Sequence, residues 1–241
     1  MCTVTIFPTG NNDFVLTSNR DETPNRISLQ PDFYSVEKTT LLFPKDKLAG
    51  GTWIGVSEKN RLICLLNGGF KNHTKKDKYR ISRGSVTKDF LIADNIENCI
   101  ENYNFEDIEP FTIVISDWNS NLKFYELVWD GNTKHFTQLP LEPKIWSSAT
   151  LYNPSMKTER LQWFNDYKKE NVLTSESILT FHKTAGKNNM DYGTVMDRGT
   201  VKTTSITQVK KTNSNVSMRY ESLQNQSIST KTLKTPQIVN G

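Results

Sequence analysis

The stretches MCTVTIF (1–7) and FVLTSNRDE (14–22) decide the fold of this chain. Both contain short apolar runs of the kind found in β-strands. The residues between them, PTGNND, include the glycine and asparagines that suit a hairpin turn. The sequence therefore opens with a predicted β-hairpin, and the Asn-Arg-Asp-Glu cluster lies near the end of its second strand.

The pairing across this hairpin determines which residues meet at the start of the chain. With the turn at PTGNND, Cys2 lies opposite Asn19 or Arg20, about 5 Å away across the strands. Asp21 follows in the same strand. A cysteine, an arginine and an aspartate are therefore expected close together.

Further strands and helices follow in clusters. Three more strand pairs are predicted: TWIGV with RLICLL, FTIVISD with LKFYELVWDG, and TVKTTSITQV with NVSMRYESL. Helices are predicted in SRGSVTKDFLIA, IENCIENY, SMKTERLQWFNDYKKE and TSESILTFHKTAG, with caps at Ser82, Asp94 and Thr174 or Ser175. Helices between sets of antiparallel strands indicate an α+β fold. We expect one domain over residues 1–223 and a flexible tail over 224–241.

Composition limits the class of protein. The chain has 241 residues, of which 35% are hydrophobic, which is enough for a buried core. The net charge of +4 is spread along the chain, and the basic run at 71–80 is typical of a solvated loop, so we expect no nucleic-acid partner. No run reaches membrane-spanning length, so no membrane insertion is expected. The sequence gives no prediction of oligomeric state.

The cysteines and histidines indicate neither a disulfide framework nor a metal site. The three cysteines (Cys2, Cys64 and Cys99) lack paired spacing, which favours a reducing compartment, and we expect a cytoplasmic protein. The three histidines share no ligand spacing, so no metal site is predicted.

Removal of Met1 would turn Cys2 into an N-terminal nucleophile, and removal is expected because Cys2 is small. The α-amine, with a reference pKa of about 7.7–8.0, can then accept the thiol proton. We expect Arg20 to favour the thiolate electrostatically and Asp21 to orient the ammonium group.

Acyl transfer also needs a donor to the oxyanion. Asn67, in LLNGG, falls opposite the GGT of residues 50–52, where backbone without side chains permits a ligand to approach. We therefore expect Asn67 at the oxyanion position.

Each of these residues also has an ordinary structural interpretation. Cys2 would be a small core residue on an apolar strand face. Arg20 and Asp21 would form a surface ion pair worth less than about 1 kcal/mol. Asn67 would start a turn. The residues alone leave these alternatives open.

A family resemblance favours the enzymatic interpretation. MCT at the start, VLTSNRDE, and GGTWIGV followed by a hairpin into LLN resemble the NRDE family, whose animal members are called transport and Golgi organisation protein 2. SRGSVTKDFL, EPFTIVISD and VKTTSITQV extend the likeness to about residue 210, and VKTTSITQV is similar to bacterial members.

The resemblance implies a four-layer α-β-β-α sandwich of the N-terminal-nucleophile hydrolase type. It implies Cys2 as nucleophile and base, Arg20 and Asp21 as its support, and Asn67 at the oxyanion position. Asn19 and Ser148 are expected at the substrate, although Ser148, in WSSATLYNPS, stands where family members usually have asparagine.

Two functions follow from the resemblance. The first is hydrolysis of a carbon–nitrogen bond in a small acyl compound, with no cofactor. The second is non-catalytic binding or trafficking of haem or an acyl ligand in the same cleft. Both predict a small-molecule substrate or ligand as the partner.

Overall fold

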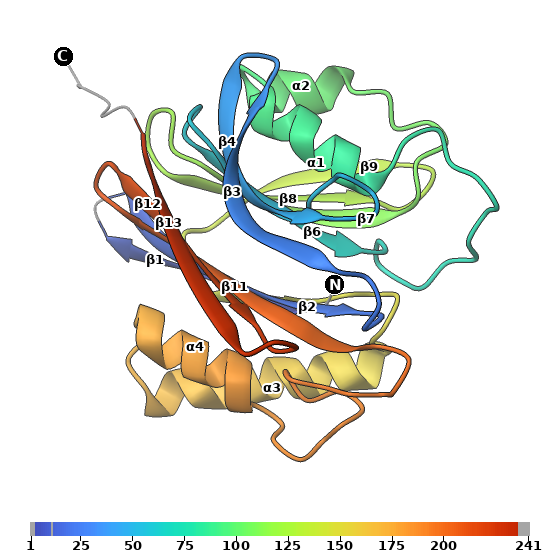
Figure 1. Cartoon of the computed structure of the whole chain (residues 1–241), viewed down its shortest axis with the longest axis vertical. Helices are drawn as coiled ribbons and strands as arrows, with labels where there is room; N and C mark the ends of the chain where they lie inside the picture. Colours follow the sequence, from blue (N-terminus) through green and yellow to red (C-terminus); the bar gives the residue numbers. More distant parts are fainter. Residues whose placement is uncertain (1–2, 11, 236–241) are drawn as a thin grey trace.

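The computed structural model describes residues 3–10 and 12–235 of the chain. In this part, two antiparallel sheets lie face to face, and a pair of helices covers the outer face of each sheet (Figure 1). The order of the layers is helix, sheet, sheet, helix. The predicted α+β sandwich is therefore confirmed.

The first sheet contains the N-terminal hairpin at its centre. Its strand order is β10-β1-β2-β11-β12-β13. The bounds are β1 Thr3–Gly10, β2 Asp13–Glu22, β10 Lys144–Ser147, β11 Lys202–Thr212, β12 Asn215–Ser222 and β13 Ser227–Lys234. The strands that flank the hairpin, β10 and β11, come from much later in the sequence.

The second sheet is a meander in which every neighbour in sequence is also a neighbour in space. Its order is β3-β4-β5-β6-β7-β8-β9. The bounds are β3 Ser28–Val36, β4 Thr39–Asp46, β5 Ile54–Ser57, β6 Arg61–Asn67, β7 Phe111–Asp117, β8 Lys123–Trp129 and β9 Lys134–Leu139.

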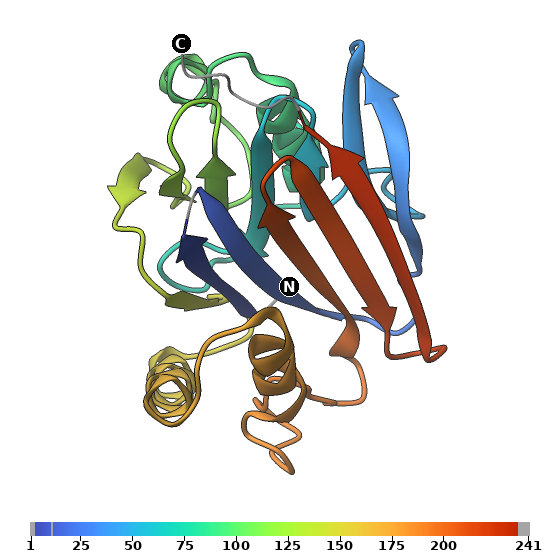
Figure 2. The ribbon, with the colours of Figure 1, turned by 90° about the vertical axis from the view of Figure 1, so that its left-hand side faces the viewer.

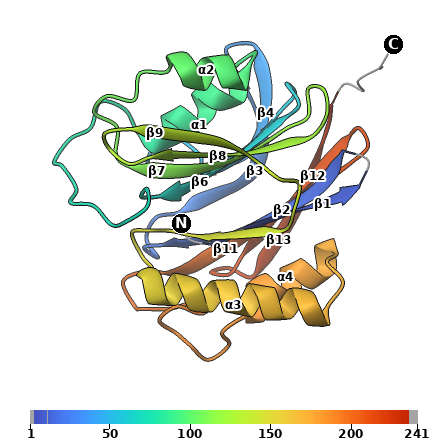
Figure 3. The same ribbon diagram turned by 180° about the vertical axis from the view of Figure 1, so that it is seen from behind.

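Four helices of the described chain form the outer layers. Helices α1 (Arg83–Ile92) and α2 (Ile96–Asn102) lie on the second sheet, and α3 (Pro154–Glu170) and α4 (Ser175–Thr184) lie on the first (Figure 3). Figure 2 shows the strands of the first sheet side by side above the yellow α3 and the orange α4. In the described residues, no helix is long and apolar enough to cross a membrane.

Three apolar clusters fill the spaces between the layers. The largest lies between the sheets and includes Val4, Leu16, Val56 and Leu62, all fully buried. A second joins α1 and α2 to the second sheet. A third joins α3 and α4 to the first sheet. Each fully buried Val, Leu, Ile or Phe side chain contributes roughly 1.5–3 kcal/mol to folding, so all four layers are held by apolar burial.

The predicted hairpins are confirmed. In the first, Thr3 pairs with Asn19 and Val4 with Ser18. The pairs β5–β6, β7–β8 and β11–β12 also form as the sequence predicts. Cys2 lies outside the described residues, so its predicted partner across the hairpin stays a prediction.

Two predictions about local structure are wrong. Residues 227–234 form β13, although we expected a flexible tail from residue 224. The strand is at a sheet edge and only Leu233 is buried, so its sequence lacks a strong apolar signal. Helix α2 is capped by Asn95, which accepts a hydrogen bond from Asn98 N, rather than by Asp94.

Candidate functional site

Alternation along β2 divides its polar residues between two layers. Successive side chains of a strand point to opposite faces of a sheet. Arg20 points toward the second sheet, where it contacts Asp46 and Trp53. Asn19 points toward the helices, where it contacts His182. Neighbours in the sequence therefore belong to different environments.

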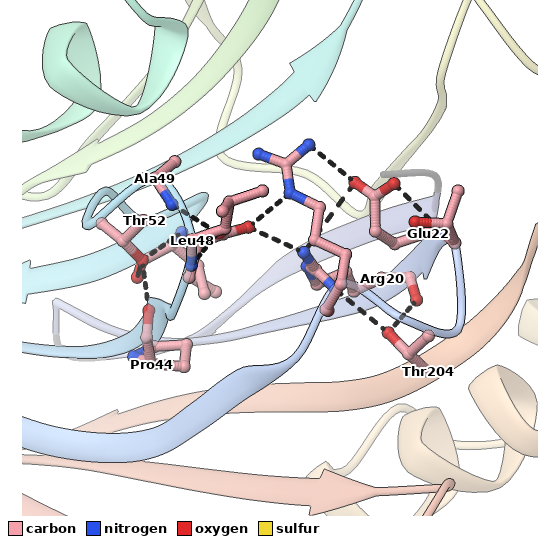
Figure 4. A network of polar contacts seen from close by, with 11 residues as sticks. Arg20, Glu22, Pro44, Leu48, Ala49, Thr52 and Thr204 are labelled. Carbon is pink, nitrogen blue, oxygen red and sulfur yellow. Dashed lines mark hydrogen bonds and ion pairs between the residues drawn. The ribbon is translucent and has the colours of Figure 1, made fainter.

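Arg20 is held by several groups although only 2% of it is exposed. Its Nη2 donates to Asp46 Oδ2 over 3.1 Å and lies 3.8 Å from Glu22 Oε2. Its guanidinium stacks 4.6 Å from the centre of the Trp53 ring, and Nη1 donates to Thr204 Oγ1 (Figure 4). These contacts fix the guanidinium plane.

Asp46 joins the arginines to the loop that follows β4. Its Oδ2 accepts from Arg26 Nε over 2.7 Å, and its Oδ1 accepts from the backbone N–H groups of Leu48 and Ala49 over 3.1 and 2.9 Å (Figure 4). Burial alone would raise the Asp46 pKa, but the Ala49 amide, Arg26 and Arg20 outweigh it, and the pKa is lowered. Asp46 is therefore held as a carboxylate.

The charge of Arg20 is opposed by its burial. Desolvation lowers the Arg20 pKa, while Glu22 and Asp46 raise it. Because arginine in water loses its proton only in strong base, the side chain stays protonated at neutral pH. A fixed positive charge thus lies at the end of β2.

Asp21 is enclosed by hydroxyl groups on the other face of β2. Tyr152 Oη donates to Asp21 Oδ2 over 2.6 Å, and Thr203 Oγ1 donates to Asp21 Oδ1 over 2.6 Å. Asp21 is 2% exposed. The surface ion pair between Arg20 and Asp21, which was the ordinary alternative, does not form because the two side chains lie on opposite faces.

A fully buried arginine of α3 supports this end of β1. Arg160 Nη1 donates to Thr3 Oγ1 over 2.5 Å, and Nη2 donates to the Gly193 carbonyl over 2.7 Å. Its guanidinium lies 3.7 Å from the centre of the Tyr152 ring. Arg160 therefore links the residue that follows Cys2 to the tyrosine that binds Asp21.

Asn67 ends β6 and faces the same cleft as Arg20. Its backbone carbonyl accepts from Ser148 Oγ over 2.8 Å. Its side-chain amide takes part in none of the hydrogen bonds between described residues. The following residue, Gly68, has φ +82° and lies so close to Ala149 and Thr150 that a Cβ would be 3.0–3.1 Å from their side chains. Only glycine fits there.

The cleft has two adjoining lobes. The first has a volume of about 390 Å³ and is lined by Arg20, Arg26, Asp46, Gly51, Thr52, Trp53 and the start of α1. The second has a volume of about 400 Å³ and is lined by Asp21, Thr23, His73, Thr150, Leu151 and Val201. Both lobes share Glu22, Asn67, Lys75, Arg83 and Glu109. Asn67 therefore lies at the boundary between them, and Gly51 and Thr52 line one of the lobes that it faces.

Arg83, Glu109 and His73 form a charged cluster in the lining of the cleft that the sequence did not predict. Arg83 Nη2 lies 3.0 Å from Glu109 Oε2, and His73 Nε2 lies 3.2 Å from Glu109 Oε1. Burial lowers the Arg83 pKa and Glu109 raises it. His73, which shares no ligand spacing with the other histidines, lines the second lobe.

Asn19 is not at the cleft, which corrects its predicted role in substrate binding. Its Nδ2 donates to the carbonyls of His182 and Thr194, and its Oδ1 lies 2.7 Å from His182 Nδ1. His182 Nε2 lies 2.8 Å from Thr5 Oγ1. Burial, with a smaller effect of Arg160, lowers the His182 pKa to about 3. Asn19 therefore joins β2 to the helix layer.

Some of the other predicted site residues line the cleft and some do not. Arg20, Asp21 and Asn67 line one cleft. Ser148 lies behind Asn67, is 1% exposed and lines neither lobe, so it supports Asn67 rather than forming the wall. Cys2 is outside the described residues, and its role stays a prediction. In the described residues, no group of three or more metal-ligating side chains is present.

The structure resembles hydrolases of low sequence identity. A variant of conjugated bile acid hydrolase from Clostridium perfringens gives a TM-score of 0.54 at 13% identity, with 98% of each chain covered. Penicillin V acylase from Agrobacterium tumefaciens gives 0.53 at 10%, covering 95% of this chain and 85% of that one. The Caenorhabditis elegans orthologue of N-acylethanolamine-hydrolyzing acid amidase gives 0.52 at 11%, covering 86% and 92%. The fold is thus that of the N-terminal-nucleophile hydrolases.

The family model for Transport and Golgi organisation 2 matches residues 1–234. The chain therefore belongs to the Transport and Golgi organisation 2 family, as the motifs in its first third predict. No curated protein matches the sequence.

Proposed function

We propose that this protein is an N-terminal cysteine hydrolase that cleaves the carbon–nitrogen bond of a small acyl compound. The observation that carries the proposal is the convergence of Arg20, Asp21 and Asn67 on one cleft at the start of β1. The three solved structures described above, whose names denote two hydrolases and an acylase, support the same reaction class.

In the proposed reaction, the α-amine of Cys2 accepts the thiol proton and Sγ attacks the amide carbon. The negative charge that develops on the carbonyl oxygen is stabilised by the side-chain amide of Asn67. The C–N bond then breaks, and the leaving nitrogen takes the proton from the ammonium group. Water hydrolyses the thioester in a second addition, which releases the acid and restores the thiol.

The surrounding residues have distinct proposed roles. Arg20 supplies a fixed positive charge that favours the thiolate. Asp21 orients the α-ammonium and is itself held by Tyr152 and Thr203.

The first test is the reactivity of Cys2 toward dilute iodoacetamide between about pH 5 and pH 9, read by intact and peptide mass. We expect Met1 to be absent and Cys2 to be alkylated at a pH where the other cysteines are not. Burial raises the pKa of Cys64 to about 12 and also raises that of Cys99, which makes both internal controls. Retention of Met1 would exclude the mechanism.

The second test uses p-nitrophenyl acetate as an acyl donor. We expect a transient acetyl group on the Cys2 peptide and none in the Cys2→Ala protein. Acetylation that persists unchanged in Cys2→Ala would assign the reaction to another residue. The proposal is supported if the Cys2→Ala protein loses the acetyl label and keeps the far-ultraviolet circular dichroism spectrum of the folded protein.

The family resemblance also suggests non-catalytic binding or trafficking of haem or an acyl ligand, and of these two ligands haem has less support. The histidine among the described lining residues is His73, whose Nε2 contacts Glu109, and no cysteine or methionine is among them. The lining is also strongly charged, whereas sites for large aromatic ligands are predominantly apolar. The residues present do not fit a haem group.

A further inference from the structure

The first lobe of the cleft is unusually rich in charged side chains for a small-molecule site. Seven of its lining residues are charged: Arg20, Glu22, Arg26, Asp46, Lys75, Arg83 and Glu109. Its apolar wall is limited to Ala49, Trp53, Leu65 and Ile81, with Tyr79 beside them. Typical small-molecule sites are lined mainly by apolar and aromatic side chains with few polar groups.

The carboxylates of this lobe already have basic partners. Asp46 is bound by Arg20 and Arg26, and Glu109 is bound by Arg83. Glu22 lies within 3.5 Å of Arg26.

Lys75 differs from the other charged residues of the lobe. It forms no ion pair with any residue that the structure describes, and it lines both lobes. The first lobe therefore has an excess of one basic side chain, at the boundary where Asn67 also lies.

These charges decide which ligands the cleft accepts. A long alkyl chain or a porphyrin would remove water from charged groups without replacing their hydrogen bonds, and that desolvation is unfavourable. A ligand carboxylate would instead pair with Lys75 and lie near Arg83, whose guanidinium is fixed by Glu109 and by the Pro110 carbonyl. Lobes of about 390 and 400 Å³ suit a small ligand.

We infer that the substrate is a small hydrophilic amide that carries a carboxylate, such as an N-acylated amino acid. The inference rests on the proposed function, because it assumes that the amide bond lies beside Asn67. Lys75 binds the carboxylate directly. Arg83 shapes the anion site from its position at the first residue of α1.

The experiment compares three probes: N-acetylglycine, N-acetylglycinamide and N-decanoylglycine. The first two differ only in the carboxylate, and the first and third only in the acyl chain. Release of the amine is followed with fluorescamine. We expect kcat/KM for N-acetylglycine to exceed that for each of the others at least about tenfold, which corresponds to about 1.4 kcal/mol.

The matched variants are Lys75→Met and Lys76→Met. Lys76 is the next residue in the same exposed loop, pairs with Asp107 and lines neither lobe. Lys75→Met is expected to remove most of the preference for the carboxylate, through a higher KM, while Lys76→Met keeps it. Equal behaviour of the two variants would overturn the role of Lys75.

The outcomes separate this inference from the proposed function. Faster hydrolysis of N-decanoylglycine, or equal hydrolysis of the two acetyl probes, would overturn the inference and leave the hydrolase proposal intact. If no probe is cleaved and Cys2 is never acylated, the hydrolase proposal fails. Calorimetric titration of Cys2→Ala protein with the same probes then decides the inference: selective binding of N-acetylglycine supports it, and no selective binding overturns it.

Discussion

On one face of β2, Thr17 and Asn19 meet the helix layer; on the other, Ser18 and Arg20 meet the second sheet. The first face is closed at these two residues: Gln208 Nε2 donates to Thr17 Oγ1, and Asn19 forms hydrogen bonds with His182 and Thr194. The second face opens at Arg20 into a cleft.

The desolvation of buried polar side chains is offset differently on the two faces of β2. Neutral side chains on the closed face are matched with backbone carbonyls and a histidine, so their cost of desolvation is offset inside the protein. Charged side chains on the open face are paired with each other and border a cavity. We therefore expect changes on the closed face to affect stability, and changes on the open face to affect chemistry as well.

The largest loss of stability is expected for Asn19→Ala. The substitution leaves two buried carbonyls and one nitrogen of His182 without their partner, which costs about 3 kcal/mol. Urea denaturation measures this loss. Alkylation of Cys2 in the folded variant should keep its pH dependence, because Asn19 does not face the cleft.

The control for Asn19→Ala is Asn102→Ala, at an exposed position where the amide donates only within its own helix. It should lower stability by less than about 0.5 kcal/mol. A loss of similar size in both variants would contradict the special role of the closed face.

A smaller loss of stability, with a change in chemistry, is expected for Arg20→Met. Asp46 loses one cation but keeps Arg26 and two backbone amides, so about 2 kcal/mol is expected rather than the full cost of an unpaired buried charge. The Cys2 alkylation profile should shift to higher pH because a positive charge is removed.

Arg26→Met removes the other cation of Asp46 and is the matched control. Arg26 is 40% exposed, so its loss should cost less than about 1 kcal/mol and leave the alkylation profile in place. The opposite result would be a shift of the pH profile of Cys2 alkylation in Arg26→Met as large as that in Arg20→Met. That result would contradict the claim that the buried cation is the one that favours the Cys2 thiolate.

The smallest effect concerns the pH dependence of stability. His182 has a folded pKa of about 3, well below its usual value. Below about pH 6.5 the unfolded chain binds a proton that the folded protein does not, so stability falls as pH is lowered toward that folded pKa. This group alone should reduce the free energy of unfolding by about 1.4 kcal/mol between about pH 8 and pH 5.5.

The His182 effect is isolated by comparing His182→Gln with His135→Gln. His135 is 43% exposed, so its variant is the control for replacing a histidine outside the core. His182→Gln should have a weaker dependence over the same pH interval. The same slope in all three proteins would contradict a neutral buried His182.

Much of the fold followed from local patterns in the sequence. The hairpin around PTGNND and the pair β5–β6 have alternating or continuous apolar runs next to turn residues, and both form as predicted. Strand β13 was missed because most of its residues are polar and only Leu233 is buried, so its strand structure depends on pairing with β12 rather than on an apolar pattern.

The candidate site was predictable only in part for a similar reason. Arg20 and Asn67 were found because short motifs contain them. Asp46 lies in a segment without such a motif. Arg83 and Tyr152 lie in SRGSVTKDFL and WSSATLYNPS, but the resemblance gave them no role, and only the folded chain brings them to β2 or the cleft. The resemblance placed Asn19 at the substrate, whereas its side chain is taken up by hydrogen bonds with His182 and Thr194.

The central position of the first hairpin has a consequence for the order of folding. Its flanking strands, β10 and β11, begin at Lys144 and Lys202. At about 5–20 residues per second, a ribosome needs roughly 10–40 s to add the residues between Glu22 and β11. Both edges of the hairpin lack partners until β10 is made, and the edge of β2 lacks its partner until β11 is made, so we expect the hairpin to be the segment of the nascent chain that most needs a chaperone.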